Sequence, residues 1–540
     1  MFFRRSFFNN FRYISGDDGD GRLIAYLYEH WVQVLRGTSS WRNPAFFYPT
    51  GNTLGYSDTF VLNELFYAPL RFLGLDMFLA YQWTLIALTA LGYTGMYQLC
   101  RRILPNQRLI CALLAAGFTF SNMLFIQVGH SQLYSIYWLP LVLLLVLRIR
   151  QGRHPGRFAF LAGLLVGLLF LSTYYVPWFA VICAGLWLLL AGALQFAGGA
   201  RPTRVRAAAL AAKWWRPSLL AVLGSAVGLI PFLVVYLPVL GLGSRSYNGV
   251  LAYASAPQDI FNTGARNFLW APLARAVSTR PQVINNEVSF ALTPLTLLTL
   301  ALCAVYLMWR VATGRAGDAR TRLGLASAIV AVAAIILPMS VHGHTLWYFV
   351  WHLVPGAKAI RAIDRIGIIT GLLTPLIIAW VIADVSRDAA DQPDSDQDPS
   401  PAASGRTRRW RAVALVVVAI LTVEQFNTSV TANTTRPTQL AELLSTPGPP
   451  SSCRAFYIAA PADRKPAVLP EVDAMLISQA VDLPTINGYS GQNPPGYGAL
   501  ANPSSPNYLK AVDAWAKANR ITSGLCAYDA STRHWTVRAG

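Results

Sequence analysis

Residues 16–21 read Gly16-Asp17-Asp18-Gly19-Asp20-Gly21, which places three carboxylates within four positions of a chain in which only 13% of residues are charged. The stretch separates an aromatic-rich N-terminus from a segment with apolar residues at helical spacing, and beyond about residue 75 long apolar runs dominate. Placing carboxylates beside a bilayer costs free energy unless water solvates them or the protein uses them in binding or catalysis. Two interpretations follow: a solvated turn with a helix cap, or a reaction centre.

The composition indicates a membrane protein. Of 540 residues, 54% are hydrophobic, which is too apolar for an ordinary soluble domain. The formal net charge is +19, but most Lys and Arg residues fall in short runs between apolar segments. This placement is typical of cytoplasmic loops and not of a basic binding face. We therefore expect the lipid bilayer as a partner and no binding to nucleic acid.

The apolar runs predict an all-α polytopic membrane protein with about ten or eleven transmembrane helices. A hydrocarbon core of about 30 Å needs about 20 apolar residues in a helix. With that length, the sequence places spans at residues 76–99, 109–127, 132–148, 158–173, 177–198, 217–238, 290–310, 323–341, 366–385 and 411–426.

The basic residues predict the orientation of these spans. Every second linker is rich in Arg, and such linkers stay in the cytoplasm. The extracytoplasmic segments are then 1–75, 128–131, 173–176, 239–289, 342–365 and everything after about 427. Since no span precedes residues 1–75, either the first span translocates them or an upstream helix is missing from the start; we favour the missing helix.

Three domains are expected. Residues 1–75 form an outer acidic loop with interfacial helices, of which 21–36 lies on the membrane surface. Residues 76–426 form the transmembrane domain, and residues 427–540 form a small extracytoplasmic α/β domain. If the outer face is a bacterial periplasm, a disulfide between Cys453 and Cys526 becomes possible.

The acidic stretch has two possible chemical roles. One carboxylate can take a proton from an acceptor hydroxyl, or several can hold a divalent cation against a phosphate. Asp17, Asp18 and Asp20 are the candidate catalytic residues. The alternative is that one of them caps the following helix, although a cap explains one aspartate and not three.

A second candidate is the basic segment 354–365, which is placed outside the membrane against the positive-inside trend. On a helix, Lys358, Arg361 and Arg365 would share one face. Three cations at the outer interface suit a lipid phosphate or pyrophosphate. The alternative is general contact with lipid headgroups.

Other polar residues of the predicted outer loops are candidates for substrate binding. His130 and Gln132 fall in a very short turn, and Tyr174 and Tyr175 fall in another. Glu287 directly precedes a predicted span and is a further candidate, because it is a carboxylate on the outer side. Each also has an ordinary explanation: an interfacial histidine, an aromatic belt, or a charge at a helix N-terminus.

Two further observations concern motifs. Residues 485–495 combine turn-forming residues, amides and an aromatic, which suits sugar contacts but equally suits a plain loop. The sequence contains no Walker-type phosphate loop, GxSxG elbow or HExxH motif.

Taken together, these features resemble the GT-C superfamily of integral-membrane glycosyltransferases, and more narrowly the bacterial YfhO-like and dolichyl-phosphate-mannose-transferase-like proteins. The resemblance rests on residues 16–20, on Phe47-Tyr48-Pro49 through Gly55-Tyr56-Ser57-Asp58, on residues 129–132 and on residues 355–365. In that superfamily the first outer loop carries the catalytic or metal-binding acidic residue. The resemblance thus implies Asp20 first and Asp17 next, with Mg²⁺ or Mn²⁺ as the ion if these two residues hold a metal.

The reaction that the resemblance implies is an inverting transfer of a sugar from a polyprenyl-phosphate-linked donor. The acceptor would be a glycan, lipid or protein on the outer, periplasmic face of a bacterial inner membrane, with the C-terminal domain outside. The alternatives are a transporter or flippase of lipid-linked sugars and a non-catalytic membrane assembly protein. A transporter is expected to carry charges within its spans and broken helices in both halves, and the predicted spans contain few charges.

Overall fold

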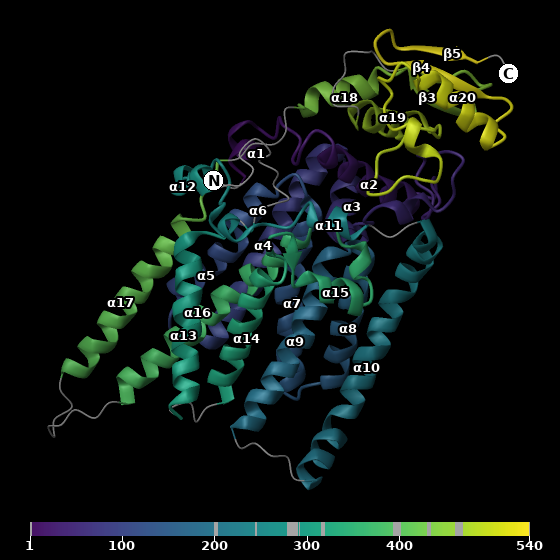
Figure 1. Ribbon diagram of the computed structural model, residues 1–540. Coiled ribbons are helices and arrows are strands. Elements are labelled where there is room, and N and C mark those ends of the chain that lie inside the picture. The colour runs from purple at the N-terminus through teal and green to yellow at the C-terminus, as the bar shows by residue number, and fades with distance from the viewer. Residues whose placement is uncertain are drawn as a thin grey trace.

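A computed structural model of the chain describes residues 3–198, 204–242, 246–277, 290, 292–314, 319–391, 401–428, 434–459 and 468–538. Long helices run side by side and form a bundle (Figure 1). The C-terminal domain, drawn in yellow, covers one end of this bundle together with short helices from the N-terminal part of the chain. We call this end the capped end.

Ten helices correspond to the ten predicted spans. They are α4 (Met77–Ile103), α5 (Arg108–Thr119), α7 (Leu139–Arg150), α8 (Pro155–Ser172), α9 (Tyr175–Ala197), α10 (Arg204–Tyr236), α13 (Pro294–Ala312), α14 (Ala319–Ile336), α16 (Gly367–Asp391) and α17 (Pro401–Val423). Among the described residues, eight helical stretches are long and apolar enough to cross a membrane, and they include all of these helices except α4 and α17. The prediction of a helical multi-pass membrane protein is confirmed.

Short elements connect the long helices. The short α-helices and the hairpin are α1 (Arg4–Phe8), α2 (Asp20–Leu35), α3 (Glu64–Phe72), α6 (Asn122–Ile126), α11 (Tyr247–Leu251), α12 (Ala271–Val277), α15 (Trp347–Leu353), β1 (Ser340–Val341) and β2 (His344–Thr345). The 3-10 helices are η1 (Thr53–Tyr56), η2 (Val61–Asn63), η3 (Ser131–Trp138), η4 (Leu237–Leu242), η5 (Pro257–Phe261), η6 (Ala357–Ala359), η7 (Ile363–Ile366) and η8 (Tyr497–Ala499).

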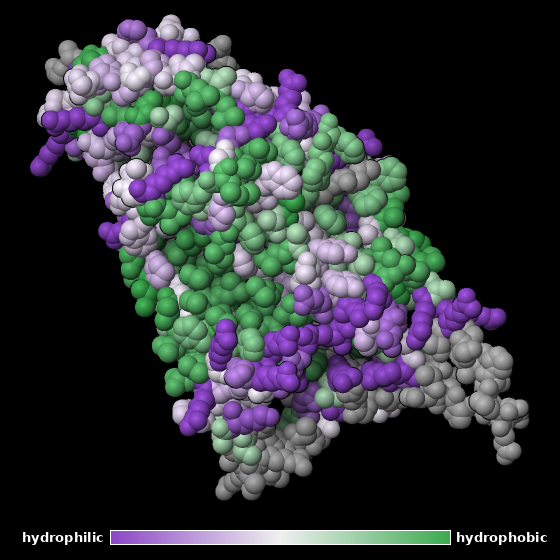
Figure 2. Space-filling view, turned by 180° about the vertical axis from the view of Figure 1, so that it is seen from behind, coloured by the Kyte–Doolittle hydropathy of each residue, from purple (hydrophilic) through white to green (hydrophobic). Residues whose placement is uncertain are grey.

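The surface of the bundle carries a broad hydrophobic band. Figure 2 shows this band across the rear face, with hydrophilic residues at the capped end and a hydrophilic rim at the opposite end. On α10 the exposed side chains include Leu219, Val222, Leu223, Val227 and Ile230. Apolar side chains exposed over such a length match the hydrocarbon core of a bilayer.

Helices α8 and α10 cross at unusually close range. Gly163 and Gly167 of α8 face Gly224 and Gly228 of α10, and a Cβ atom added at Gly163 would overlap a backbone carbonyl oxygen of α10. Glycines four residues apart let two membrane helices approach until their backbones touch. This contact fixes α10 against the bundle, and the sequence analysis above did not predict it.

The C-terminal domain has the predicted α/β character. It contains α18 (Arg436–Leu444), β3 (Ala455–Ala459), α19 (Val468–Val481), α20 (Tyr508–Ala518), β4 (Leu525–Asp529) and β5 (His534–Val537). The strand order is β3-β4-β5, with β3 parallel to β4 and β4 antiparallel to β5. Cys453 and Cys526 are joined by a disulfide that closes a sequence separation of 73 residues.

Helix α2 differs from the expected surface helix. It begins and ends near the predicted bounds, but every residue from Gly21 to Val32 is buried. One side packs against α3 and α4, and α19 of the C-terminal domain covers another side. The amphipathic pattern identified the helix correctly, but it could not show that a domain more than 400 residues later covers the polar side.

A buried arginine fastens these two parts together. Arg22 is 2% exposed, and its Nη1 donates to Asp473 Oδ1 at 2.6 Å and to Gln439 Oε1 at 2.8 Å. Its Nε also donates to the carbonyl oxygen of Asp18 at 2.6 Å. The start of α2 is therefore held by α18 and α19, so the acidic stretch has a fixed position relative to the C-terminal domain.

Candidate functional site

The three aspartates of the acidic stretch have three different environments. Asp17 Oδ1 accepts from the backbone N–H groups of Gly19 at 3.0 Å and Gly21 at 3.3 Å, so this carboxylate satisfies the first turn of α2. Asp18 Oδ1 accepts from the backbone N–H of Thr434 at 2.8 Å and from its hydroxyl at 2.6 Å. Asp18 therefore anchors the chain that leads into the C-terminal domain.

Asp20 alone lies between side chains that can take part in chemistry. Its Oδ2 lies 3.0 Å from His130 Nδ1, and the hydroxyl of Tyr489 donates to its Oδ1 at 2.6 Å. Burial acts to raise the pKa of Asp20, but His130, the Tyr489 hydroxyl and the charge of Arg365 together hold this pKa below its ordinary value. Asp20 is thus an ionised carboxylate that is only partly exposed.

The pKa of Asp17 shifts in the opposite direction. Burial raises it, and the negative charge of Asp20 raises it further. Two carboxylates whose pKa values are pushed apart in this way are typical of sites that handle protons. The structure thus distinguishes an ionised Asp20 from an Asp17 that holds a proton more readily.

The histidine loop reaches Asp20 because its backbone comes very close to the acidic stretch. A Cβ atom at Gly129 would lie 3.2 Å from Asp17 Oδ2, so a larger side chain would press on that carboxylate. The next element, η3, is held by Ser131, whose Oγ lies 2.8 Å from the Tyr81 hydroxyl. The buried Oε1 of Gln132 has no hydrogen-bond partner among the described residues.

The basic segment reaches the same place, but not as one helix. Residues 357–359 and 363–366 form two separate 3-10 turns, so the expected shared face of three cations is wrong. Arg365 is buried, and its Cζ lies 5.3 Å from the centre of the Tyr175 ring. Arg361 lies with its Cζ 4.7 Å from the ring of Tyr253, while Lys358 is exposed.

The two tyrosines of the short outer turn hold the basic segment in place. The Tyr174 hydroxyl donates to the carbonyl oxygen of Gly356 at 3.0 Å. The Tyr175 hydroxyl accepts from the backbone N–H of Arg361 at 2.9 Å. Their contacts are therefore with the chain that carries Arg361 and Arg365.

Asp58 is a further acidic residue of this region. Its Oδ1 accepts from the backbone N–H of Tyr174 at 3.0 Å. Burial raises the pKa of Asp58 to about 6, although the Tyr174 N–H and the charge of Arg365 oppose the shift. The residue stands in the motif quoted for the resemblance, but nothing in its sequence context singled it out as an acid of the site.

Tyr489 was also missed. Residues 485–495 suggested sugar contacts by composition, whereas the hydrogen bond to Asp20 joins positions 469 apart in the sequence. No periodicity or spacing could reveal a pair so distant. Glu287, a predicted substrate contact, lies outside the described residues.

The candidate ligands of the predicted Mg²⁺ or Mn²⁺ ion already have hydrogen-bond partners within the protein. Both oxygens of Asp20 are engaged by His130 and Tyr489, and Asp17 Oδ1 serves two backbone N–H groups. Across the described ranges, no three His, Cys, Asp or Glu side chains form a group that could hold a metal ion. The ion stays a prediction.

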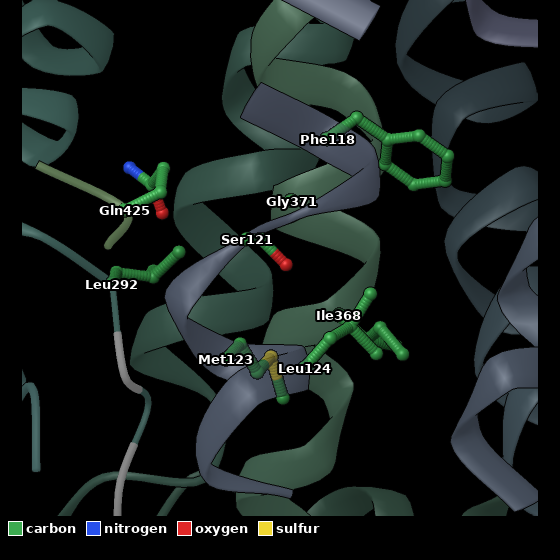
Figure 3. Close-up of a pocket in the computed structure, with 8 residues that line it drawn as sticks. All are labelled: Phe118, Ser121, Met123, Leu124, Leu292, Ile368, Gly371 and Gln425. Atoms are coloured by element: carbon green, nitrogen blue, oxygen red, sulfur yellow. The ribbon is translucent and has the colours of Figure 1, made fainter. Parts of the chain in front are cut away.

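An apolar pocket opens near the start of α16. It is small and lies between α5, α6 and α16 (Figure 3). The lining residues are Phe118, Ser121, Met123, Leu124, Leu292, Ile368, Gly371 and Gln425. Ile368 and Gly371 follow Arg365 by three and six residues, so the pocket lies at the start of α16, directly after the turn η7 that carries the buried arginine.

The sequence matches no family model and no curated protein. Solved structures do match the fold. The mycobacterial arabinofuranosyltransferase AftD has a TM-score of 0.45 at 15% identity, covering 91% of this chain and 31% of AftD. The Archaeoglobus fulgidus oligosaccharyltransferase has a TM-score of 0.45 at 12% identity, covering 96% and 64%. ArnT from Cupriavidus metallidurans bound to undecaprenyl phosphate has a TM-score of 0.39 at 12% identity, covering 88% and 82%.

These are likenesses of fold at low identity, and the resemblance to GT-C membrane glycosyltransferases, with its YfhO-like grouping, stays a prediction. The chain spans less than two thirds of the first two proteins. A likeness with TM-scores below 0.5 assigns no role to any residue. The roles proposed below therefore rest on the contacts within this chain.

Proposed function

We propose that the protein is a glycosyltransferase that moves a sugar from a polyprenyl-phosphate-linked donor to an acceptor hydroxyl on the outer face of a bacterial inner membrane. The observation that carries this proposal is the convergence of an ionised carboxylate and a buried cation. Asp20 is held by His130 and Tyr489, and Arg365 is close enough to lower its pKa. Segments from four distant parts of the chain build this site.

The chemistry follows from these groups. Asp20 takes the proton of the acceptor hydroxyl as that oxygen attacks the anomeric carbon. The bond between that carbon and the phosphate oxygen breaks, and the polyprenyl phosphate leaves with both electrons of the bond. Attack opposite the leaving group inverts the anomeric configuration. Arg365 and Arg361 offset the charge of the leaving phosphate.

His130 and Tyr489 support the base in this scheme. His130 orients the Asp20 carboxylate through Oδ2, and Tyr489 orients it through Oδ1. The two contacts leave the remaining lone pairs of the carboxylate to meet the acceptor. They also keep Asp20 ionised at neutral pH, because both favour the charged form.

A small pocket lies on the helix that follows Arg365, and most of its lining side chains are apolar. A polyprenyl chain does not fit in this pocket. It would lie in the bilayer along the exposed apolar surface of the bundle, with its phosphate next to the arginine at the head of α16. The positive-inside pattern favours the same orientation, with the capped end and the C-terminal domain outside.

The experiment is a transfer assay with the full chain in nanodiscs. A panel of radiolabelled polyprenyl-phosphate monosaccharides serves as donors, and envelope glycans and lipids serve as acceptors. Asp20→Asn is expected to lower transfer at least 100-fold while the binding of undecaprenyl phosphate changes less than threefold. Arg365→Gln is expected to weaken that binding at least tenfold.

The control is Asp482→Asn. Asp482 is exposed and has φ +52°, a backbone region that asparagine tolerates well, so transfer should match the unmodified protein. If Asp20→Asn retains full transfer, the assignment of the base is wrong. If no donor is consumed, but a lipid-linked sugar crosses the bilayer when the same chain is placed in sealed vesicles, the transporter interpretation replaces this one.

A further inference from the structure

Glu471 is a buried carboxyl group for which the site described above has no use. It lies on α19, 2% exposed, and its Oε2 accepts from the backbone N–H of Gly488 at 2.7 Å and from the Tyr497 hydroxyl at 2.9 Å. Its Oε1 is buried and has no hydrogen-bond partner in the described part of the chain. A buried carboxyl group is costly, so its position needs a reason.

The residue that Glu471 holds is directly before Tyr489. The ring of Phe47 also lies close to Gly488, because a Cβ atom added at Gly488 would overlap that ring. Residue 487 is held as well, since Asn487 Oδ1 accepts from the backbone N–H of Ile458 at 2.8 Å. Three consecutive residues are thus fixed, and the third delivers its hydroxyl to Asp20 at 2.6 Å.

We propose that Glu471 is a positioning residue, which fixes Gly488 and thereby holds the Tyr489 hydroxyl on Asp20. The inference rests on the proposed function for its catalytic meaning, because Tyr489 matters only if Asp20 is the base. That Glu471 fixes Gly488, and with it the position of the Tyr489 hydroxyl, does not depend on that function. The C-terminal domain then completes the site, since it supplies both Tyr489 and the group that orients it.

The surroundings of Glu471 indicate that its carboxyl group is protonated at neutral pH. Burial raises its pKa to about 8, although the hydrogen bonds from the Gly488 N–H and the Tyr497 hydroxyl oppose the shift. The groups that face it from neighbouring elements are the hydroxyls of Tyr497 and Tyr508 and the polar atoms of residues 487–488. A glutamine, which is neutral at all pH values, is therefore the closest replacement.

The test measures the Tyr489 segment directly by hydrogen exchange of peptides covering residues 486–492 in the full chain. Glu471→Ala should speed exchange of the Gly488 amide at least tenfold, and Glu471→Asp should give an intermediate increase because its carboxyl group is shorter by one carbon. Glu471→Gln should preserve the protection at pH 7. Asp482→Asn, which removes the charge of an exposed carboxylate just after α19, is the matched control and should change nothing.

Transfer kinetics provide the second measurement. Glu471→Ala should lower kcat about tenfold with less than a twofold change in KM for the donor, and Tyr489→Phe should do the same. The double variant should be no slower than Tyr489→Phe alone, because both changes remove one contact. Additive losses would show that Glu471 acts through general stability, which overturns the proposal.

The two measurements separate the possible failures. Unchanged exchange in both Glu471→Ala and Glu471→Asp overturns the positioning role, whatever the activity. If Glu471→Ala does not fold, Glu471→Asp decides the question by the same exchange criterion. Faster exchange in a chain that transfers no sugar from any donor supports the positioning link and refutes the proposed function.

Discussion

Replacing Arg22 with leucine should loosen the attachment of the C-terminal domain to the first outer loop. The substitution removes the 2.6 Å ion pair to Asp473, the 2.8 Å hydrogen bond to Gln439 and the 2.6 Å hydrogen bond to the carbonyl oxygen of Asp18. It also removes the Arg22 cation from the Asp473 carboxylate, which is 4% exposed. The second effect dominates, because taking the cation away from a buried ion pair costs more than losing a surface contact.

The magnitude follows from the burial of both partners. Breaking a buried ion pair by removing one member costs about 3–5 kcal/mol. For a unit of ~150–250 residues, each kcal/mol lowers Tm by about 2–4 °C. We therefore expect Arg22→Leu to lower the first thermal transition by about 10 °C. Since the start of α2 carries Asp20, transfer should fall as well.

The assay is thermal unfolding of the purified chain in detergent, followed through a fluorophore that reports on the C-terminal domain. Lys510→Met on the exposed face of α20 is the control and should shift the transition by less than 1 °C. The double variant Arg22→Leu with Asp473→Leu removes both charges and should regain part of the loss. The reasoning is refuted if the Tm of Arg22→Leu lies within 2 °C of the unmodified protein. It is also refuted if the double variant loses more Tm than the two single variants lose together.

Three further predictions follow from other parts of the fold. The pKa of Glu471 is raised to about 8, so between about pH 4.5 and 8 the folded state binds more protons than the unfolded state, and stability falls as pH rises. Glu471→Gln should remove this decline, and the Tm of this variant relative to the unmodified protein should rise from pH 5 to 8. Gly163→Leu should prevent the close crossing of α8 and α10 and sharply reduce folded protein on size-exclusion chromatography, whereas Gly185→Leu, with open space around it, should not. Reduction of the Cys453–Cys526 disulfide should destabilise the C-terminal domain by about 2–4 kcal/mol, and Cys453→Ser should make the Tm insensitive to dithiothreitol.

The fold was largely predictable from local patterns. Apolar runs of about 20 residues gave the long helices, because a bilayer fixes the length of a helix that crosses it. The predicted α/β character of the C-terminal domain agrees with the helices and strands observed there. The predicted outer placement made a disulfide between Cys453 and Cys526 possible, and the structure contains it.

The predicted site was harder, because its contacts are between distant positions. The composition drew attention to residues 16–21, but only the structure separates the anchoring Asp18 from the Asp20 that meets His130. The spacing of the cations suggested a helix, whereas the chain at 357–366 makes two short turns. Tyr489 and Glu471 lie in a different domain from Asp20, and no local pattern relates them.

The order in which the ribosome makes these parts has a consequence for the timing of activity. Asp20 is synthesised early, and the long helices enter the membrane before residue 489 exists. Tyr489, whose hydroxyl contacts Asp20, and Asp473, which pairs with Arg22, both come from the last quarter of the chain. In a nascent chain that is still being inserted, Asp20 therefore lacks its hydrogen bond from Tyr489. Under the proposed function, such a chain has no means of consuming lipid-linked sugars until its final domain has folded onto the first loop.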